Sequence, residues 1–443
     1  MNRLITKEPE IKVGVIEQRR EVAGTFKGPF RLENGCFIEG DFRACRENDQ
    51  VILFNSAGTE VARKKEIRCL PVANSTCILL DVTIGIHFHW ERKQVQEFCG
   101  GLILKPDGSE TLTVVNVLPL EDYLESVISS EMSAEAPIEF LKAHAITSRS
   151  WIVAMLQSRL KVSTSPVSFR GDDEIIRSYG RVAHHYFDVC ADDHCQRYQG
   201  ITRLISENAR NAVLATRGLF LIHNHQICDA RYHKACGGLT DNFRSAWENI
   251  SVPYLTSISD SDIMHPPICD EKDAQSWIMA NPKAYCNTRD GKILKQILPV
   301  FDQETSDFFR WKMVYSSEEL KKIIQKKSGI DFGNILNMEA VERGPSGRIV
   351  RLKIEGSKRT IIVGKELEIR RWLSRTHLYS SAFIVATEHN ESGNAISFTL
   401  HGAGWGHGVG LCQIGAAVMA AQGFSANDIL KHYFRDAEIK KLY

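Results

Sequence analysis

The sequence predicts an α+β fold, in which a β-rich amino-terminal part precedes a mixed α/β part. Short β-branched segments separated by turn residues fill positions 1–118, two helical periodicities follow between 118 and 156, and strand-like and helix-like segments alternate from there to the end. At 443 residues the chain is long enough for two or three domains of roughly 100 to 200 residues each. We expect a β-rich region of no assignable role at 1–81 and a second domain at 82–443.

Composition excludes some classes of protein. The formal net charge is +1 and no basic stripe is visible, so no nucleic-acid partner is expected. No apolar run approaches the roughly 18 residues that a membrane-spanning helix needs. The first twenty residues lack the apolar core of a secretion signal, and the twelve cysteines have no regular spacing. Free thiols fit a reducing compartment, which predicts a cytoplasmic location.

The amino-terminal part is predicted to consist of short strands joined by tight turns. Turn residues stand at 32–35 and at 106–108. The segments expected as strands include 11–16, 51–54, 77–81 and 112–117. The first ninety or so residues carry no motif with interpretable chemistry, so binding or packing is their default role.

Two helical patterns then flank Glu131. Apolar residues recur at steps of three and four over 120–128 and again over 138–155, and Pro137 separates the two runs. This predicts a helix hairpin with Glu131 in the last turn of its first helix. Helix-end carbonyls and the apolar neighbours Ile128 and Met132 should raise the pKa of this carboxyl, as a general acid for glycosidic cleavage requires. The alternative is an ordinary solvated Glu at a helix end.

A dense group of metal-binding residue types follows at 184–195. Two thiols and three imidazoles lie within these twelve residues, and zinc prefers such ligands in a tetrahedral arrangement. The expected ligands are His184, Cys190, His194 and Cys195, with His185 as the substitute for His184. Four protein ligands would close the ion to substrate and make it structural. A disulfide between the two cysteines and an unliganded polar loop are the alternatives.

Two further stretches carry groups suited to binding a sugar. Tyr232 and Lys234 can donate hydrogen bonds to hydroxyls, and two glycines at 237–238 allow close approach to the backbone. A second metal site at 223–238 is less favoured, because a strand pair would divide its ligands between two faces. Near the carboxyl end, Trp405 could stack on a sugar ring while His407 and Gln413 hydrogen-bond it; the alternative is a tightly packed loop.

The remaining elements are predicted more briefly. Residues 256–304 interrupt regular structure and are expected to be an insertion, more an ordinary surface excursion than a flap. A helix at 317–327, a hairpin at 349–362, a short helix at 364–373 and a helix at 413–421 complete the chain.

Taken in order, these motifs resemble the SpoIID/LytB family, the stage II sporulation protein D and amidase-enhancer group. The resemblance covers residues from about 82 to the end and leaves out the first ninety or so. It rests on several ordered stretches: Val117-Leu118-Pro119-Leu120-Glu121-Asp122-Tyr123-Leu124, Glu131-Met132, Leu141-Lys142-Ala143-His144-Ala145-Ile146-Thr147-Ser148-Arg149, His194-Cys195-Gln196-Arg197-Tyr198-Gln199-Gly200, Tyr232-His233-Lys234 with Gly237-Gly238, and Gly404-Trp405-Gly406-His407-Gly408-Val409-Gly410. His144 and the segment 148–151 depart from the family's usual residues.

The resemblance implies a sporulation-related lytic transglycosylase that cuts the MurNAc-GlcNAc bond of peptide-free peptidoglycan strands or fragments and leaves 1,6-anhydro-MurNAc ends. It implies Glu131 as the catalytic residue, and Arg149 and the stretch Tyr232, His233 and Lys234 as substrate-binding residues. It also supports the four zinc ligands named above. The family's substrate lies outside the cytoplasmic membrane, in the periplasm or cell wall, which conflicts with the location expected from composition.

Two other functions stay open on the sequence. A non-catalytic protein of this family would bind glycan and enhance an N-acetylmuramoyl-L-alanine amidase, which would be its protein partner. A zinc-dependent hydrolase is the third interpretation, because the Cys and His residues at 184–195 are those that zinc binds.

Overall fold

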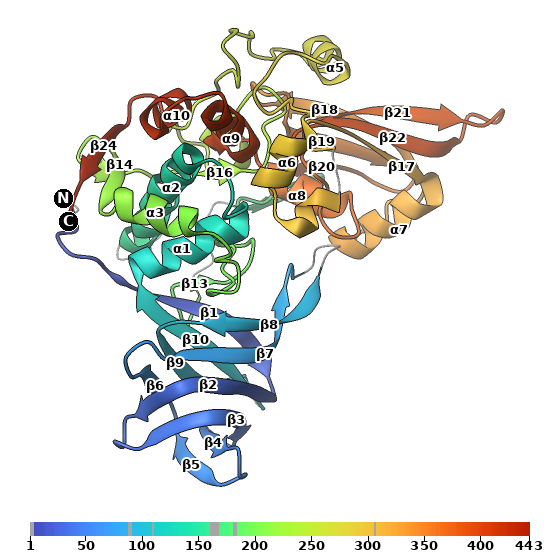
Figure 1. The fold of residues 1–443 in the computed structure, drawn as a ribbon. Coiled ribbons are helices and arrows are strands. Elements are labelled where there is room, and N and C mark those ends of the chain that lie inside the picture. The colour runs from blue at the N-terminus through green and yellow to red at the C-terminus, as the bar shows by residue number, and fades with distance from the viewer. Residues whose placement is uncertain (1–3, 87–90, 109, 160–167, 180–183, 305–306) are drawn as a thin grey trace. The chain divides into compact units, whose positions relative to one another are not determined.

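The computed structural model describes residues 4–86, 91–108, 110–159, 168–179, 184–304 and 307–443. It is mixed α/β, with 37% of residues in strands and 24% in helices. The chain divides into two compact units. Figure 1 labels the helices and strands of both. Unit 1 contains residues 1–149, 183–219 and 441–443, and unit 2 contains residues 150–182 and 220–440.

Unit 1 is built on one large sheet. Within the described residues it has eleven strands in the order β13-β1-β10-β9-β6-β2-β3-β4-β5, with β7 paired to β2 and β8 paired to β7. The strands are β1 Glu10–Arg19, β2 Glu21–Leu32, β3 Phe37–Glu47, β4 Gln50–Asn55, β5 Glu60–Lys64, β6 Ile67–Pro71, β7 Thr76–Ile84, β8 Arg92–Phe98, β9 Gly101–Asp107, β10 Thr111–Pro119 and β13 Val189–Cys190. The four segments expected as strands from the sequence are therefore confirmed.

The pairing of β1 with β10 brings the first strand of the sheet to the strand that enters the helical region. Ile11 lies opposite Leu118 and Val13 opposite Asn116, and the side chains of Ile11 and Val13 are fully buried. On its other side β1 pairs in parallel with β13, which carries Cys190. The sheet therefore fixes the start of the helical region and one predicted metal ligand together.

Three helices complete the described part of unit 1. They are α1 Leu120–Glu131, α2 Ile138–Arg159, which continues into unit 2, and α3 Glu207–Ala215, which packs against α1. Pro119 precedes the first turn of α1, where its missing N–H costs nothing. The two predicted helices around the break at 133–137 are confirmed as elements; their packing as a hairpin stays a prediction.

Unit 2 contains several smaller sheets and most of the helices. Its strands, of which β14 and β24 reach the unit boundary, are β11 Phe169–Arg170, β12 Glu174–Ile176, β14 Leu219–His223, β15 Gln226–Ile227, β16 Tyr232–His233, β17 Arg310–Ser316, β18 Ile335–Arg343, β19 Ile349–Gly356, β20 Thr360–Gly364, β21 Phe383–His389, β22 Ala395–Ala403, β23 Leu411–Cys412 and β24 Glu438–Lys441. Its helices are α4 Phe243–Ala246, α5 Glu271–Met279, α6 Gly291–Ile297, the 3₁₀ helix η1 Val300–Glu304, α7 Ser317–Ser328, α8 Glu366–Trp372, α9 Gln413–Ala421 and α10 Ala426–Tyr433. The predicted helices near 317, 364 and 413 and the hairpin at 349–362 are confirmed.

The main core of unit 2 lies between α7 and α8 and the strands β17 to β22. Leu320 and Ile324 of α7, Trp372 of α8 and Phe398 of β22 belong to one buried cluster. α7 follows the capping rules closely, since the Ser316 hydroxyl accepts from the amide of Glu319 and the helix ends at a left-handed glycine. Such a core holds the surrounding loops in place.

The structure differs from two predictions about domain organisation. The boundary placed after residue 81 falls inside β7, and strands on both sides of it belong to the same sheet. The segment 256–304, expected as a surface excursion, contributes fully buried residues to unit 2, among them Asp260, Cys286 and Ile297. Polar breaks in its sequence mark turns between short helices rather than a detachable loop.

Among the described residues, no helix is long and apolar enough to cross a membrane.

Unit 1 carries a carboxyl group that titrates far from its usual range. Burial, together with the neighbouring Asp122, raises the pKa of Glu125 from 4.5 to about 7. The folded protein therefore keeps a proton that the unfolded chain has lost between these pH values, and stability falls as pH rises through this window. We expect Glu125→Gln to raise the melting temperature at about pH 8 and to leave it unchanged at about pH 4. An equal shift at both values, in thermal unfolding by circular dichroism, would contradict this assignment.

Candidate functional site

Glu131 is the last residue of α1, as the sequence predicts. Its side chain is 7% exposed, and the fully buried Ile128 and Met132 flank it in the chain. The backbone N–H of Arg197 donates to Oε1 of Glu131 at 3.0 Å. One carboxylate oxygen is therefore held in a fixed position by a group outside the helix.

The segment 196–199 is fastened along α1 at several points. The hydroxyl of Tyr123 donates to Oε1 of Gln196 at 2.9 Å, and the backbone N–H of Gln199 donates to the hydroxyl of Ser126 at 3.2 Å. The rings of Tyr123 and Tyr198 stack with centroids 5.4 Å apart. Because these contacts lie on both sides of Arg197, its amide is held against Glu131.

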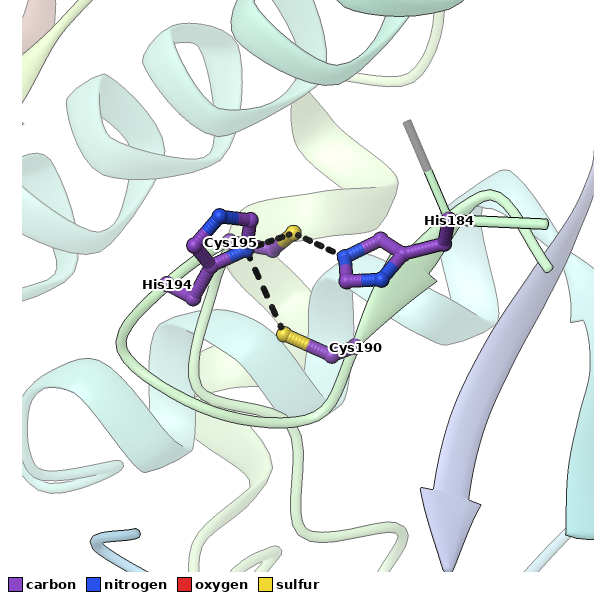
Figure 2. Close-up of side chains that lie close together, drawn as sticks. All are labelled: His184, Cys190, His194 and Cys195. Carbon is purple, nitrogen blue, oxygen red and sulfur yellow. Dashed lines mark hydrogen bonds between the residues drawn. The ribbon is translucent and has the colours of Figure 1, made fainter. Parts of the chain in front are cut away.

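The predicted metal ligands lie immediately before this segment, and the structure brings all four together. One ligand atom from each of His184, Cys190, His194 and Cys195 lies within 4.8 Å of the others. Figure 2 shows the two imidazoles and the two thiols pointing toward a common centre. Nε2 of His184 is 3.3 Å from Sγ of Cys195, and Nδ1 of His194 is 3.4 Å from the same sulfur and 3.8 Å from that of Cys190.

This geometry fits a tetrahedral zinc site. Tetrahedral coordination at about 2.3 Å for sulfur and about 2.0 Å for nitrogen places neighbouring ligand atoms roughly 3.3 to 3.8 Å apart. The ring of His184 stacks on Phe187, whereas the ring of His185 lies edge-on to Tyr186, so His184 rather than His185 faces the cluster. Cys190 and Cys195 are free thiols.

The ligand loop, residues 184–195, is also joined by an ion pair to Arg197, the residue whose amide binds Glu131. The guanidinium of Arg197 binds the carboxylate of Asp193, which stands between the ligand positions of the loop. Both side chains are largely buried. Ligand loop, Arg197 and Glu131 thus form one connected structure within unit 1.

Arg149, a residue expected to bind substrate, lies in a different environment. Its side chain is fully buried and makes a bidentate ion pair with Glu121. Nε of Arg149 lies 3.0 Å from Oε1 of Glu121, and Nη2 lies 2.6 Å from Oε2. Nη1 donates to the carbonyl of Leu219 at 3.1 Å. The hydroxyl of Tyr443 donates to the same carboxylate. This geometry favours a structural role for Arg149, and substrate binding by it stays a prediction.

The other predicted substrate-binding residues come together in unit 2. β16 and β23 pair in parallel, with Tyr232 opposite Leu411 and His233 opposite Cys412. The glycine-rich loop 404–410 therefore lies directly beside the Tyr-His-Lys motif. The glycines at 404, 406, 408 and 410 all have positive φ, between 74° and 93°, a conformation that side chains disfavour.

Arg348 holds this loop, and its role was not visible in the sequence. It is fully buried and donates from Nε and Nη2 to the carbonyl of Gly406, at 3.2 and 3.1 Å, and from Nη1 to that of Cys236. A Cβ at position 408 would overlap the guanidinium, so Gly408 is needed for close packing as well as for its φ. An isolated Arg between two strands gives no sequence signal for such a function.

His233 and His407 are both neutral at physiological pH. Burial, with Arg348 nearby, lowers the pKa of His233 to about 3, and loss of solvation also lowers the pKa of His407. Nδ1 of His233 donates to the carbonyl of Val409 at 3.1 Å, so its Nε2 is an acceptor, and no partner for that atom lies among the described residues. The two rings are edge-on, 5.6 Å apart. They can bind a hydroxyl group without adding charge.

The remaining three predicted residues are less accessible than expected. Nζ of Lys234 makes a buried ion pair with Asp302 at 2.8 Å. The ring of Trp405 stacks on that of Tyr379 at 4.1 Å. Gln413, the first residue of α9, is 2% exposed. Substrate contact by these side chains stays a prediction.

Two family models match different parts of the chain. Residues 108–223 match a family model described as stage II sporulation protein, SpoIID, and residues 241–410 match a model described as a domain of unknown function. The chain is 26% identical over 327 residues to stage II sporulation protein D of Bacillus amyloliquefaciens, covering 74% of this chain and 76% of that protein. It is 24% identical to the protein of the same name from Bacillus subtilis.

A third relative carries a different name. The chain is 23% identical over 328 residues to the amidase enhancer of Bacillus subtilis, covering 70% of this chain but 39% of that protein. Residues 108–223 thus form a SpoIID domain, which places this part of the chain in the SpoIID/LytB family. Membership of this family indicates a cell-wall-related function.

The first testable consequence concerns Arg149. Removal of one partner from a buried ion pair costs about 3 to 5 kcal/mol, because the other charge stays buried without compensation. We expect Arg149→Met to lose about this much unfolding free energy in urea titration, and the double variant Arg149→Met/Glu121→Gln to recover part of it. If Arg149 acted only on substrate, the single variant would keep wild-type stability and lose glycan binding.

The second consequence concerns the ligand loop. We expect Cys195→Ser to lose one equivalent of zinc per chain after dialysis, measured by mass spectrometry of the metal, and to unfold at lower temperature because the loop is no longer cross-linked. Cys36→Ser changes an exposed free thiol of the same unit and serves as the matched control. Equal zinc content in the two variants would exclude a metal at this loop.

Proposed function

We propose that this protein is a peptidoglycan lytic transglycosylase in which Glu131 is the catalytic acid and base. The observation that carries the proposal is the placement of Glu131 within a SpoIID domain, nearly buried and fixed by the amide of Arg197. A nearly buried carboxyl group held in a fixed position is suited to exchange a proton with a substrate oxygen. The names of the relatives agree with an action on the cell wall.

The chemistry needs one carboxyl group that acts twice. Protonated Glu131 donates its proton to the glycosidic oxygen while the bond from that oxygen to C1 of MurNAc breaks, with an oxocarbenium-like transition state. The carboxylate then takes the proton of the C6 hydroxyl of MurNAc, whose oxygen bonds to C1 and closes the 1,6-anhydro ring. Glu131 is protonated again at the end, and no water is consumed.

We propose a structural zinc ion at His184, Cys190, His194 and Cys195. All four ligands come from the protein, so the ion has no open position for water or substrate. Its contribution would be to rigidify the loop that places Arg197. Brief chelation should therefore leave the activity of folded protein unchanged, whereas a zinc-dependent hydrolase would lose it at once.

The proposed substrate is peptidoglycan glycan, as polymeric strands without stem peptides or as soluble fragments. Tyr232, His233 and His407 are proposed to bind it in unit 2, because neutral imidazoles can form hydrogen bonds with the hydroxyl groups of a sugar ring. Lys234, Trp405 and Gln413 complete the proposed set, with Arg149 as a predicted member that the geometry favours less. The protein partner, if one exists, is proposed to be an amidase.

The decisive variant is Glu131→Gln, because glutamine has nearly the same size and shape as glutamate but cannot act as a general acid or base. We expect formation of anhydro-ended products from denuded glycan to fall by about 10²-fold or more, in line with the usual value of general acid catalysis. Products are measured by chromatography and mass spectrometry. Glu135→Gln, four residues further on and exposed, is the matched control and should keep full activity.

An enhancer function is the second candidate, because one relative is named an amidase enhancer. Wild-type protein that binds denuded glycan, forms no anhydro ends and accelerates an added amidase would establish that function in place of the first. Full transglycosylase activity of Glu131→Gln would instead show that catalysis uses another group.

A further inference from the structure

A second group of thiols lies in the interior of unit 2. It consists of Cys236, Cys286 and Cys412 with the carboxylate of Asp260. All four side chains are at most 2% exposed, and one ligand atom of each lies within 4.8 Å of the others. The mechanism proposed above uses none of them.

The arrangement of these atoms is that of four ligands around one centre. Sγ of Cys236 is 3.5 Å from Sγ of Cys286. Neighbouring thiolates in a tetrahedral zinc site are roughly 3.8 Å apart, given bonds of about 2.3 Å. All three thiols are free, and a disulfide could join only two of them, which would leave one thiol and a carboxylate together in a dry interior.

The groups around the cluster are those that stabilise metal-bound thiolates. The backbone N–H of Cys236 donates to Sγ of Cys412, and the N–H of Gly238 donates to Sγ of Cys236, both at 3.3 Å. Hydrogen bonds from amides to ligand sulfurs orient such ligands and offset their charge. Arg310, a largely buried cation, interacts electrostatically with Cys236 and Cys286. It therefore compensates part of the negative charge that three thiolates and a carboxylate bring to one ion.

Asp260 is oriented in the way expected of a ligating carboxylate. Its Oδ2 accepts from the backbone N–H of Cys286 at 2.8 Å, and its Oδ1 accepts from the hydroxyl of Tyr433. A Cβ at position 415 would overlap this carboxylate, so Gly415 makes the space for it. Each oxygen keeps a lone pair beyond these hydrogen bonds, which leaves one free to bind a cation.

We propose that Cys236, Cys286, Cys412 and Asp260 bind a second zinc ion, in a closed structural site. Thiolate and carboxylate are both zinc ligands, and three soft sulfurs exclude magnesium and calcium. The site is separate from the ligand loop at 184–195, which belongs to unit 1.

The proposed ion would join parts of unit 2 that are distant in sequence. Cys236 follows β16 and Cys412 ends β23, the two strands that place the Tyr-His-Lys motif beside the glycine-rich loop. Asp260 and Cys286 come from the segment 256–304. Coordination would therefore fix this segment against the strands that carry the candidate sugar-binding residues.

Metal content of the full-length protein, purified without chelators, tests the proposal. We expect Cys286→Ser and Cys412→Ser each to lose one equivalent of zinc per chain relative to wild type. Cys228→Ala is the matched control: it removes another buried free thiol of unit 2 outside the cluster and should keep the wild-type zinc content. Unchanged zinc content in both serine variants would overturn the proposal.

A second measurement does not depend on the folding of Cys286→Ser or Cys412→Ser. It uses Cys195→Ser, which is expected to lack the metal of the ligand loop, after exchange of its remaining zinc for cobalt(II). We expect the intense thiolate-to-cobalt charge-transfer absorption of a tetrahedral site rich in sulfur. Absence of that absorption would contradict a metal site here. So would a disulfide between Cys236 and Cys286, which would lower the mass of the protein, purified without reductant, by two hydrogens. Either result would leave the proposed activity of Glu131 unaffected.

Discussion

The hydrogen bond from the amide of Arg197 to Glu131 depends on a short covalent connection. Arg197 stands two residues beyond Cys195, so the ligand loop determines where this amide can lie. The ion pair from its side chain to Asp193 adds a second constraint on the same residue. A carboxyl group at the end of a helix, where the backbone could fray, is thereby held from outside the helix. The ligand loop, strand β13 and helix α1 together fix the position of the Glu131 carboxyl group.

Local pattern in the sequence was sufficient for most individual elements. The spacing of apolar residues located α1 and α2, and β-branched runs located four strands of the first sheet. The ligand loop was also recognisable, because its four candidate ligands fall within twelve residues and His184 was the first choice. These features share one property: the residues that define them are neighbours in the chain.

Features that depend on distant residues were not recognisable. The family resemblance implies that Arg149 binds substrate, and only the fold shows that Glu121, 28 positions away, occupies its guanidinium. Arg348 binds the carbonyl of Gly406, 58 residues further on. The single sheet across residue 81 likewise results from the pairing of β1 with β10 and of β6 with β9, which no local pattern encodes. Cys286 had no evident partner in the sequence for the same reason.

The two clusters of thiols also differ in how far apart their residues are in the sequence, and therefore in when each cluster can form. His184 and Cys195 are 11 residues apart, whereas Cys236 and Cys412 are 176 residues apart. Closing the short loop costs little chain entropy and can occur as soon as that segment has been synthesised. The buried cluster of unit 2 can form only once Cys412 has been synthesised, 176 residues after Cys236. Until then the thiols of Cys236 and Cys286 lack the third sulfur of the cluster and stay open to oxidation.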